Sequence, residues 1–490
     1  MTTDQEGAVA DGLSGATDEG GRVAREEAAP RRPDRGARGT EYVVAPGKRV
    51  PPGKHVITAD LGYGDAGKGG VVEWLCSARG DTTVVRYNGG AQAAHNVVAG
   101  DGRWHTFSQF GSGSLGGART FLSRYMMIDP LAMAGEAEHL SALGLASPFG
   151  LVAVDSGALL TTPYHQAANR AREMARGAGR HGSCGMGIGE TAAYALARPG
   201  DAPHVGDCLT ASVLTGKLSV LRDWAREELG IDELPAPAAV ADAYRAWADR
   251  VTITRDGYLA NLLRQPGSVV FEGAQGILLD EWRGFHPYTT WSTTTFENAE
   301  TLLREAGMAG AALRLGVTRA YMTRHGPGPF VTEDPTLDLP EPHNHAGQWQ
   351  GPVRAGHLDA VALRYAVEAC GGIDAVALTH LDTAAEHAGE LRICRAYRVG
   401  ERGLADRLVP GPHRDLAYQE RLASMLLAAR PVYGRAPVSD ADWCDAVAEI
   451  TGAPVSLRSY GPSAAAKVST GKISTAKAGN LRAALAAISR

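Results

Sequence analysis

The chain has 490 residues, of which 44% are hydrophobic and 21% are charged. This composition excludes a disordered, a collagen-like and a small disulfide-stapled protein, and it is typical of a chain with a large buried core. Lys and Arg number 49 against 54 Asp and Glu, which gives a formal net charge of −5. The net charge therefore gives no reason to expect a nucleic-acid partner or an anionic membrane surface.

Cysteine usage and the first residues indicate the cell compartment. Six cysteines are scattered without a CxxC pair, which argues against a zinc ribbon and a disulfide framework. The first 20 residues carry five acidic residues and no Lys or Arg, unlike a signal or transit peptide, and no stretch of about 18 uninterrupted apolar residues occurs. We expect a cytoplasmic protein that does not span a membrane.

In chain order, the first predicted element is a disordered tail at residues 1–50. These residues are rich in Gly, Ala, Asp, Glu and Arg and poor in aromatic and β-branched residues, so they cannot offset the entropy cost of ordering. The β-prone run His55–Asp60 then leads through glycine-rich sequence into Val71–Cys76, which suits a helix. This strand, loop and helix open a single catalytic domain that we place at residues 51–470.

The alternation of strands and helices continues along the chain. The further predicted elements are strands at 82–87, 150–154, 268–271 and 375–379, a helix at 359–370 and a mostly helical insertion at 207–265. Residues 471–490, rich in Ala, Lys and Ser, are predicted to be a tail or a loosely held helix. We therefore expect an α/β fold with a large, mainly parallel central sheet covered by helices, and a ligand site beyond the carboxyl ends of the strands.

The first segment that indicates chemistry is the glycine-rich run Gly62–Gly69. It fits GxxxxGK, the phosphate loop in which glycine amides surround phosphate oxygens and a lysine, here Lys68, neutralises charge. Gly69 stands where a Ser or Thr normally follows the lysine and holds Mg²⁺. A metal ion would therefore need another ligand, and Asp65 is the nearest candidate. The alternative is a glycine-rich turn with a solvated lysine, which the strand before the run and the helix after it disfavour.

Three more clusters follow predicted strand ends. Small residues after the strand that contains Val84 and Val85 end at His95, although a lone histidine is more often structural than catalytic. Phe271–Gly276 precedes the Ser/Thr-rich run Thr289–Thr295, which is either a surface loop or a site for phosphate and sugar hydroxyls. Thr379–Asp382 is similar to the base-reading sequence of guanine-nucleotide proteins, but an aspartate that caps a helix is equally consistent with it.

Taken in chain order, eight segments resemble the adenylosuccinate synthetase family of purine-pathway ligases. The resemblance covers about residues 54–465, and its segments are GYGDAGKGG, VVRYNGGAQAAHNVV, FEGAQGILLD, HPYTTWSTTT, TRAYMTRHGPGPFVTE, GHLDAVALRYAV, THLD and SYGPS. It implies a P-loop-like GTP-binding ligase fold. The implied reaction transfers the γ-phosphoryl group of GTP to the 6-oxygen of inosine monophosphate (IMP), after which L-aspartate displaces phosphate and adenylosuccinate forms.

The resemblance also implies which groups react. Asp65 would be the general base that takes the N1 proton of IMP, and it would bind Mg²⁺ together with the backbone carbonyl of Ala94. His95 would be a general acid placed toward the transferring phosphoryl group. Gln275 would bind the 6-oxygen of IMP as charge builds there.

Other positions are implied to bind the two nucleotides and the amine. Those for the phosphates of GTP are Gly64, Gly67, Lys68 and Gly69, and those for its base are Asp382, Ser459 and Gly461. Those for the substrates are Gln92, Cys184, Arg198, Thr290 and Arg354. The resemblance implies that Arg198 is supplied across the interface of a homodimer and that Arg354 binds the carboxylates of L-aspartate.

Departures from the family pattern leave the substrates open. The substituted positions are Ala66, Gly70, Gln92, Cys184 and His380. Residues 348–359 keep only Arg354 of an arginine cluster that clasps L-aspartate, although His343, His345 and Arg324 could share that task. Three hypotheses follow: a ligase for IMP and L-aspartate, a specialised relative that uses another purine-like nucleotide or amine, and a nucleotide-binding protein without ligase activity. GTP and ATP also both stay open as donors, because the base-reading segment lacks its lysine.

Overall fold

The structure is a computed structural model that describes residues 54–470, apart from 181, 342–348, 350 and 402, and two short strands before them. These strands are β1 (Tyr42–Val43) and β2 (Arg49–Val50). The rest of the predicted tail at 1–50, the predicted tail or helix at 471–490, and both His343 and His345 lie outside the described residues.

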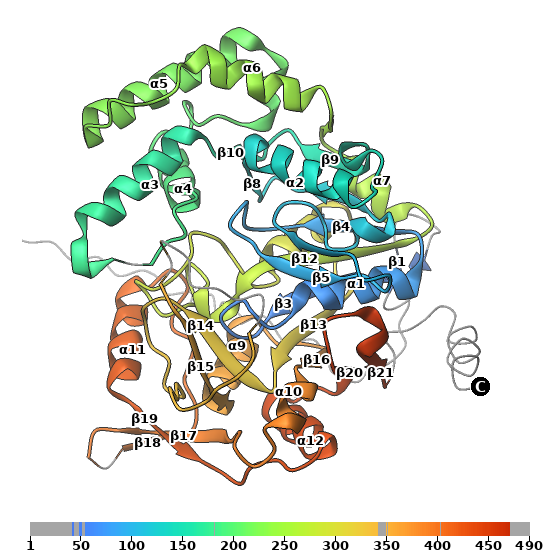
Figure 1. Cartoon of the computed structure of the whole chain (residues 1–490), viewed down its shortest axis with the longest axis vertical. Coiled ribbons are helices and arrows are strands. Elements are labelled where there is room, and N and C mark those ends of the chain that lie inside the picture. The colour runs from blue at the N-terminus through green and yellow to red at the C-terminus, as the bar shows by residue number, and fades with distance from the viewer. Residues whose placement is uncertain are drawn as a thin grey trace, which may run out of the picture. The chain divides into compact units, whose positions relative to one another are not determined.

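A ten-stranded sheet lies at the centre of the described chain (Figure 1). Its strands in spatial order are β11 (Thr252–Thr254), β9 (Val152–Asp155), β7 (Arg119–Leu122), β4 (Thr82–Arg86), β12 (Ser268–Gly276), β3 (His55–Asp60), β13 (Ala312–Arg319), β16 (Ala375–Thr379), β20 (Val455–Ser459) and β21 (Lys467–Ser469). All neighbours run parallel except β21, which pairs antiparallel with β20. The predicted parallel sheet is therefore confirmed.

Helices cover both faces of this sheet, as the alternation of side chains along β3 shows. Val56 packs in a core cluster with helix α1 (Lys68–Arg79), while its neighbour Ile57 belongs to a second cluster on the opposite face. The helices that contribute to that second cluster include α7 (Tyr258–Arg264), α8 (Glu297–Glu305), α9 (Ala360–Ala369), α11 (Leu416–Ala428) and α12 (Asp440–Thr451).

The other helices and strands surround this centre. The predicted helical insertion contains α5 (Ala211–Leu229) and α6 (Pro237–Ala248), which share a core with α2 (Pro130–Ala142), α3 (Pro163–Ala175) and α4 (Ile188–Ala197). A second sheet holds β14 (Tyr321–His325), β15 (Val353–Asp359), β17 (Ile393–Val399), β18 (Gly403–Ala405) and β19 (Arg430–Tyr433). The remaining elements are α10 (Leu381–Glu386) and the strands β5 (His95–Val98), β6 (Trp104–Phe107), β8 (Met127–Ile128) and β10 (Leu159–Leu160).

Two strand boundaries differ from the predicted ones by two residues or more. The strand predicted at 150–154 begins only at Val152, because Pro148–Leu151 forms a short 3₁₀ helix. The strand predicted at 268–271 continues to Gly276, so the motif FEGAQG lies within the strand rather than after it.

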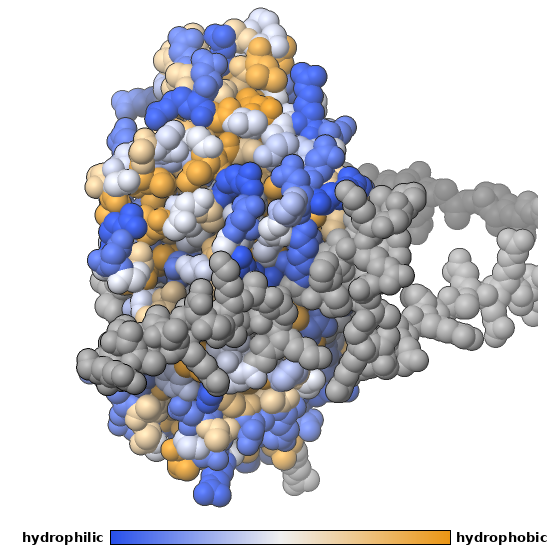
Figure 2. All heavy atoms as spheres, turned by 90° about the vertical axis from the view of Figure 1, so that its right-hand side faces the viewer, coloured by the Kyte–Doolittle hydropathy of each residue, from blue (hydrophilic) through white to orange (hydrophobic). Residues whose placement is uncertain are grey.

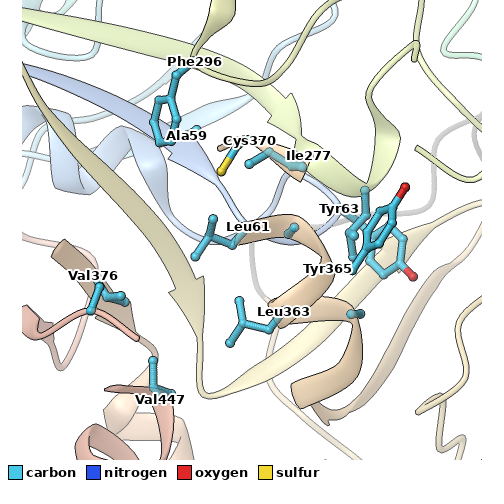
Figure 3. Close-up of a cluster of buried hydrophobic side chains, with 14 of the residues drawn as sticks. Ala59, Leu61, Tyr63, Ile277, Phe296, Leu363, Tyr365, Cys370, Val376 and Val447 are labelled. Carbon is cyan, nitrogen blue, oxygen red and sulfur yellow. The ribbon is translucent and has the colours of Figure 1, made fainter. Parts of the chain in front are cut away.

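The largest core cluster includes residues at the start of the glycine-rich loop. Figure 3 shows Leu61 and Tyr63 of this loop together with Leu363 and Tyr365 of α9, and all four belong to the same buried cluster. Tyr63 is only two residues before Asp65, so the loop is attached to the core next to its acidic residue.

The surface offers no membrane-spanning element in the part of the chain that is described. None of its helices is both long and apolar enough to cross a bilayer. The face drawn in Figure 2 mixes charged and apolar residues.

Candidate active site

Two cavities lie beyond the carboxyl ends of the central strands. Cavity A, of about 300 Å³, is lined by the predicted residues Gly64, Asp65, Gly67, Lys68, Gly69, Ala94, His95, Asp382, Ser459 and Gly461. Cavity B, of about 450 Å³, is lined by the predicted residues Gln92, Cys184, Gln275 and Thr290. Two predicted residues, Arg198 and Arg354, line neither cavity.

The walls of the two cavities contact each other where the glycine-rich loop touches the end of β12. A Cβ atom on Gly64 would lie 3.2 Å from the Cα of Gln275, and one on Gly276 would lie 2.1 Å from the carbonyl oxygen of Gly62. Gln275 itself has a φ of 55°, a left-handed conformation that is uncommon for a residue with a side chain. Glycines thus let the two segments approach, and Gln275 stands at their junction.

Within the loop, the side chain of Asp60 accepts hydrogen bonds from backbone amides and from Lys68. Its Oδ1 accepts hydrogen bonds from the amides of Gly62 and Gly64 at 2.8 and 3.2 Å, and its Oδ2 accepts one from the amide of Ala66 at 2.7 Å. The ammonium of Lys68 donates to Asp60 Oδ2 at 3.0 Å and to the carbonyl oxygen of Gly64 at 2.6 Å. Lys68 lines cavity A, but in this structure its charge is paired inside the protein.

Asp65 contacts a histidine that the sequence did not single out. His325 Nε2, at the end of β14, lies 3.1 Å from Asp65 Oδ2. Burial works to raise the pKa of Asp65, but the hydrogen bond from His325 and the charges of His325, Arg319 and Lys68 lower it below its ordinary value. The carboxyl group is therefore ionised at neutral pH.

His95 is held by a buried glutamate. Its Nδ1 lies 2.6 Å from Oε1 of Glu272. Oε1 also accepts a hydrogen bond from the hydroxyl of Ser112, and Oε2 accepts one from the amide of Ser112. Burial alone would raise the pKa of Glu272, but Arg86, His95 and Ser112 together lower it to about 2. Since this carboxylate is an acceptor only, Nδ1 of His95 is the donor.

The imidazole of His95 is neutral at neutral pH. Burial lowers its pKa, and the hydrogen bond and charge of Glu272 oppose this only in part. With its proton on Nδ1, the neutral ring presents Nε2 as an acceptor.

Close packing accounts for two departures in the glycine-rich loop. A Cβ on Gly69 would lie 2.9 Å from the Cβ of His95, so a Ser or Thr cannot be placed there without moving the histidine. A Cβ on Gly70 would lie 3.1 Å from the ammonium nitrogen of Lys467. A lysine from the end of the sheet thus approaches the position where the family pattern has a lysine in the loop.

The far end of cavity A contains an aspartate with an unused acceptor. His380, in a left-handed conformation, caps the start of α10, and Asp382 lies in the first turn of this helix. Oδ1 of Asp382 is buried without a hydrogen-bond partner among the described residues. Gly461 and Ser459 line the same cavity, with the Ser459 hydroxyl donating to the carbonyl oxygen of Gly461 at 3.0 Å. A buried acceptor without a partner is costly, which favours a ligand donor at this position.

Cavity B is polar on one side and aromatic on the other. Gln92 Nε2 donates to Gln275 Oε1 at 3.4 Å, and Oε1 of Gln92 is buried without a partner among the described residues. Trp282 and Trp291 line the aromatic side. This combination suits a planar polar ring.

The two predicted arginines outside the cavities have partners of their own. Arg198 pairs with Glu228 at 2.8 Å, and its side chain is 41% exposed. Arg354 makes a two-pronged pair with Glu333, and it also donates to the carbonyl oxygens of Gly326 and Gly328. Binding of a dicarboxylate at Arg354 therefore requires competition with Glu333.

Comparison with known proteins identifies the family. The sequence profile of adenylosuccinate synthetase matches residues 57–468. This chain belongs to the adenylosuccinate synthetase family. The adenylosuccinate synthetase of Desulfovibrio desulfuricans is 35% identical over 351 residues, which cover 68% of this chain and 80% of that protein. That of Neisseria meningitidis serogroup A is 30% identical over 433 residues, which cover 84% and 96%.

Solved structures show the same fold. Fully ligated adenylosuccinate synthetase from Plasmodium falciparum matches with a TM-score of 0.71 and 21% identity over 85% of this chain and 99% of that one. Succinoaminodeoxyadenylate synthetase of cyanophage S-2L, bound to dGMP and to dATP as an energy donor, matches with a TM-score of 0.53 and 16% identity over 89% and 99%. The predicted ligase fold is therefore confirmed.

Several residues of this adenylosuccinate synthetase site were missed in the sequence. Asp60 ends one predicted strand and Glu272 directly follows another. An acidic residue next to a buried apolar run was the available signal at both positions. His325 stands in the quoted segment TRHGPGP without an assigned role, and Lys467 lies beyond the last family segment. Arg324, proposed to help bind L-aspartate, instead donates to the carbonyl oxygens of Pro327 and Pro329.

Proposed function

We propose that the protein is an adenylosuccinate synthetase in which cavity A binds GTP and cavity B binds IMP. The observation that carries this proposal is the division of the family positions between two touching cavities. Every position implied to bind GTP lines cavity A, and Gln92, Cys184, Gln275 and Thr290 all line cavity B. The γ-phosphoryl group then has a short path from one cavity to the other, past Asp65 and Gln275.

In the proposed first step, Asp65 acts as the general base. It takes the N1 proton of IMP, so that the 6-oxygen attacks the γ-phosphorus and the bond from phosphorus to GDP breaks. Gln275 binds the 6-oxygen at the junction of the cavities. In the second step the amine nitrogen attacks C6, the bond from C6 to oxygen breaks, and phosphate leaves.

His95 acts toward the phosphoryl group in this proposal. Its neutral ring has Nε2 as an acceptor, and the negative charge of a bound triphosphate favours uptake of a proton there. Glu272 fixes the ring and stabilises the imidazolium. The proton on Nε2 is then available for the oxygens that carry charge during transfer.

The described residues fit a Mg²⁺ ion that is bound mainly by the nucleotide. No group of three or more His, Cys, Asp or Glu side chains with metal-binding geometry occurs among them. Mg²⁺ commonly takes one or two carboxylates and otherwise water and substrate phosphates. Asp65 and the backbone of Ala94 both line cavity A and would hold the ion, which neutralises phosphate charge when it is bound.

GTP is the proposed donor because of Asp382. A carboxylate oxygen without a partner in a base pocket matches the two donors, N1–H and N2–H, of guanine. Adenine offers an acceptor at N1 and would leave this oxygen without a partner. The carboxylate of Asp382 can make this contact without the lysine that the base-reading segment lacks.

A homodimer is proposed from the position of Arg198. This arginine is outside both cavities of its own chain, and Leu196, two positions before it, is a large apolar side chain that is 72% exposed. Such a surface is typical of a contact between copies, and Arg198 would reach the partner's cavity B.

All six cysteines are free thiols, and a reducing cytoplasm is the proposed location of the protein.

The amine is proposed to be L-aspartate, with one specific alternative. Since Glu333 already pairs with Arg354, an amine with fewer carboxylates would bind without displacing it. The structure therefore favours testing monocarboxylate amines as the second candidate.

One assay tests the proposal. Purified protein receives Mg²⁺, GTP or ATP, and IMP or a 2-aminopurine nucleotide such as GMP or dGMP, with a panel of amines, and phosphate release and adduct mass are followed. We expect the IMP–aspartate adduct with GTP as donor. Asp65→Ala and His95→Asn should abolish turnover while nucleotide binding stays measurable by calorimetry. An adduct only with another amine or nucleotide would replace the substrate assignment, and no adduct with any combination would reject ligase activity.

A further inference from the structure

His325 and Asp65 stand between the two cavities. His325 lines cavity B, Asp65 lines cavity A, and their contact at 3.1 Å joins β14 of the second sheet to the glycine-rich loop. The residues are 260 positions apart in the sequence, and each side chain is about a quarter exposed, 22% for His325 and 24% for Asp65. The pair is thus accessible from the ligand side while its own contact is enclosed.

A rigid framework holds the two residues at this distance. The guanidinium of Arg324, next to His325, lies 4.5 Å from the ring centroid of Tyr63, and Tyr63 is two residues before Asp65. The Tyr63 hydroxyl donates to the carbonyl oxygen of Pro329 at 3.0 Å, and Arg324 donates to that same oxygen at 3.0 Å. The turn after β14 is therefore fastened to the loop on both sides of the Asp65–His325 contact.

A glycine in this turn is needed for the framework. Gly328 has a φ of 107°, and a Cβ there would lie 2.2 Å from a guanidinium nitrogen of Arg324. Arg324 is 1% exposed and donates hydrogen bonds to backbone carbonyl oxygens of this turn, so it stabilises the turn.

The contact gives the two carboxylate oxygens of Asp65 different surroundings. Asp65 Oδ2 is inaccessible to solvent and faces Nε2 of His325, so the accessible part of the carboxyl group carries the other oxygen, Oδ1. Nε2 of His325 is 3.1 Å from Oδ2, within the distance of an ion pair. A carboxylate fixed through one oxygen cannot rotate away when its other oxygen takes a proton.

We propose that His325 is a positioning residue for the reaction: it holds Oδ2 of Asp65 so that Oδ1 stays on the ligand side, where the N1 proton of the purine nucleotide must reach it. This inference rests on the proposed function, since it takes Asp65 as the base. Loss of correct orientation affects the chemical step and leaves ground-state binding of both nucleotides largely unchanged.

Two substitutions at one position test the proposal. His325→Leu removes the donor and keeps an apolar side chain of similar size, while His325→Gln keeps an N–H donor at similar reach. We expect kcat to fall about 100-fold in the leucine variant with KM for both nucleotides within about threefold, and to return to within about tenfold of the wild type in the glutamine variant. His387→Leu is the matched control, because His387 makes an imidazole–carboxylate contact of the same 3.1 Å with Glu390 and lines neither cavity.

Other results would overturn the proposal. They are equal losses of kcat in the leucine and glutamine variants, a rise in KM at unchanged kcat, or no change. A wild-type protein that forms no adduct would instead reject the proposed function. In that case the contact is still tested by urea unfolding of Asp65→Asn, His325→Leu and the double variant: non-additive shifts of the midpoint support the pairing, and additive shifts overturn it.

Discussion

The Asp60 carboxylate gives the glycine-rich loop its shape before any ligand arrives. It accepts hydrogen bonds from three loop amides and pairs with the ammonium of Lys68, and its side chain is almost completely buried. A triphosphate in cavity A therefore meets a loop that is already formed, with the amides at the start of α1 still available to it.

Asp60→Asn should destabilise the protein strongly. The amide side chain can still accept from loop amides, but it leaves the buried ammonium of Lys68 without an anion, and breaking a buried pair costs about 3–5 kcal/mol. Urea unfolding followed by circular dichroism measures the loss. Asp101→Asn, which breaks an exposed pair with Arg103, is the control and should change little. Equal losses in both variants would contradict the buried-pair explanation.

Sequence analysis found the reacting residues that lie in local motifs and missed the residues that hold them. Asp65 and His95 stand in glycine-rich segments after strands, where the physical reason for a ligand site is local. Their holders, His325 and Glu272, are 260 and 177 positions away. Such pairs depend on strand order and register, and no local pattern encodes these.

Among the structural elements, the turn after β20 depends on one buried lysine. The ammonium of Lys467 donates to the carbonyl oxygens of Gly461, Pro462 and Ser463 at 3.4, 3.1 and 2.9 Å. Gly461 and Pro462 line cavity A beside Asp382, so the lysine shapes the base end of that cavity.

Lys467→Met should raise the KM for the donor nucleotide about tenfold at nearly unchanged kcat, because the turn loses three hydrogen bonds. Burial lowers the pKa of Lys467 to about 8, so the wild-type KM should also rise with pH above 8, while that of the methionine variant stays flat. The pKa of Lys467 is lower in the folded than in the unfolded state, so between pH 8 and 10.5 the unfolded chain binds more protons than the folded one. The free energy of unfolding that Lys467 contributes therefore increases as pH rises through this range. A wild-type KM that is flat from pH 7 to 9.5 would contradict the prediction.

Helix α9 begins at a carboxyl group that is easier to protonate than usual. Asp359 Oδ1 accepts from the amides of Val361 and Ala362, and the Tyr397 hydroxyl donates to Oδ2 at 2.6 Å. Burial raises the pKa of Asp359 to about 6 in spite of these hydrogen bonds. The folded state therefore binds more protons than the unfolded state between about pH 4 and 6, and ionisation of Asp359 lowers stability as pH rises through this range.

Asp359→Asn should remove this part of the pH dependence. The variant keeps an acceptor for the helix cap and carries no charge, so relative to wild type it should gain stability from pH 4.5 to 7, by at most about 3 kcal/mol. Thermal unfolding across this range measures the difference between the two proteins. A difference that does not change with pH would show that Asp359 titrates normally.

The elements themselves were more predictable than their arrangement. His55–Asp60 and Ala375–Thr379 are rich in residues that favour buried strands, and both form strands with the predicted bounds. Their place in the sheet was not predictable, because β13, which separates them, comes from a segment to which the sequence assigned no strand.

At the scale of the whole chain, residues 1–50 are proposed to be dispensable for catalysis. Their composition offers little apolar surface to bury, and the sheet that carries both cavities begins at His55. Deletion of residues 2–50 should leave kcat and the thermal midpoint unchanged. A deletion that continues through Thr58, and so removes half of β3, is the control and should abolish soluble expression. Loss of activity in the shorter deletion would assign the segment a function.

The sheet order has a consequence for biosynthesis. β3 and β4 are translated early, but they are not neighbours, because β12 lies between them and begins only at Ser268. By about residue 255 the ribosome has delivered β4, β7, β9 and β11, which can pair with one another and leave the inner edge of β4 open, while β3 has no partner at all. Open strand edges attract other chains. A nascent polypeptide of this length thus exposes several strand edges, and β12 covers two of them when it emerges between β4 and β3.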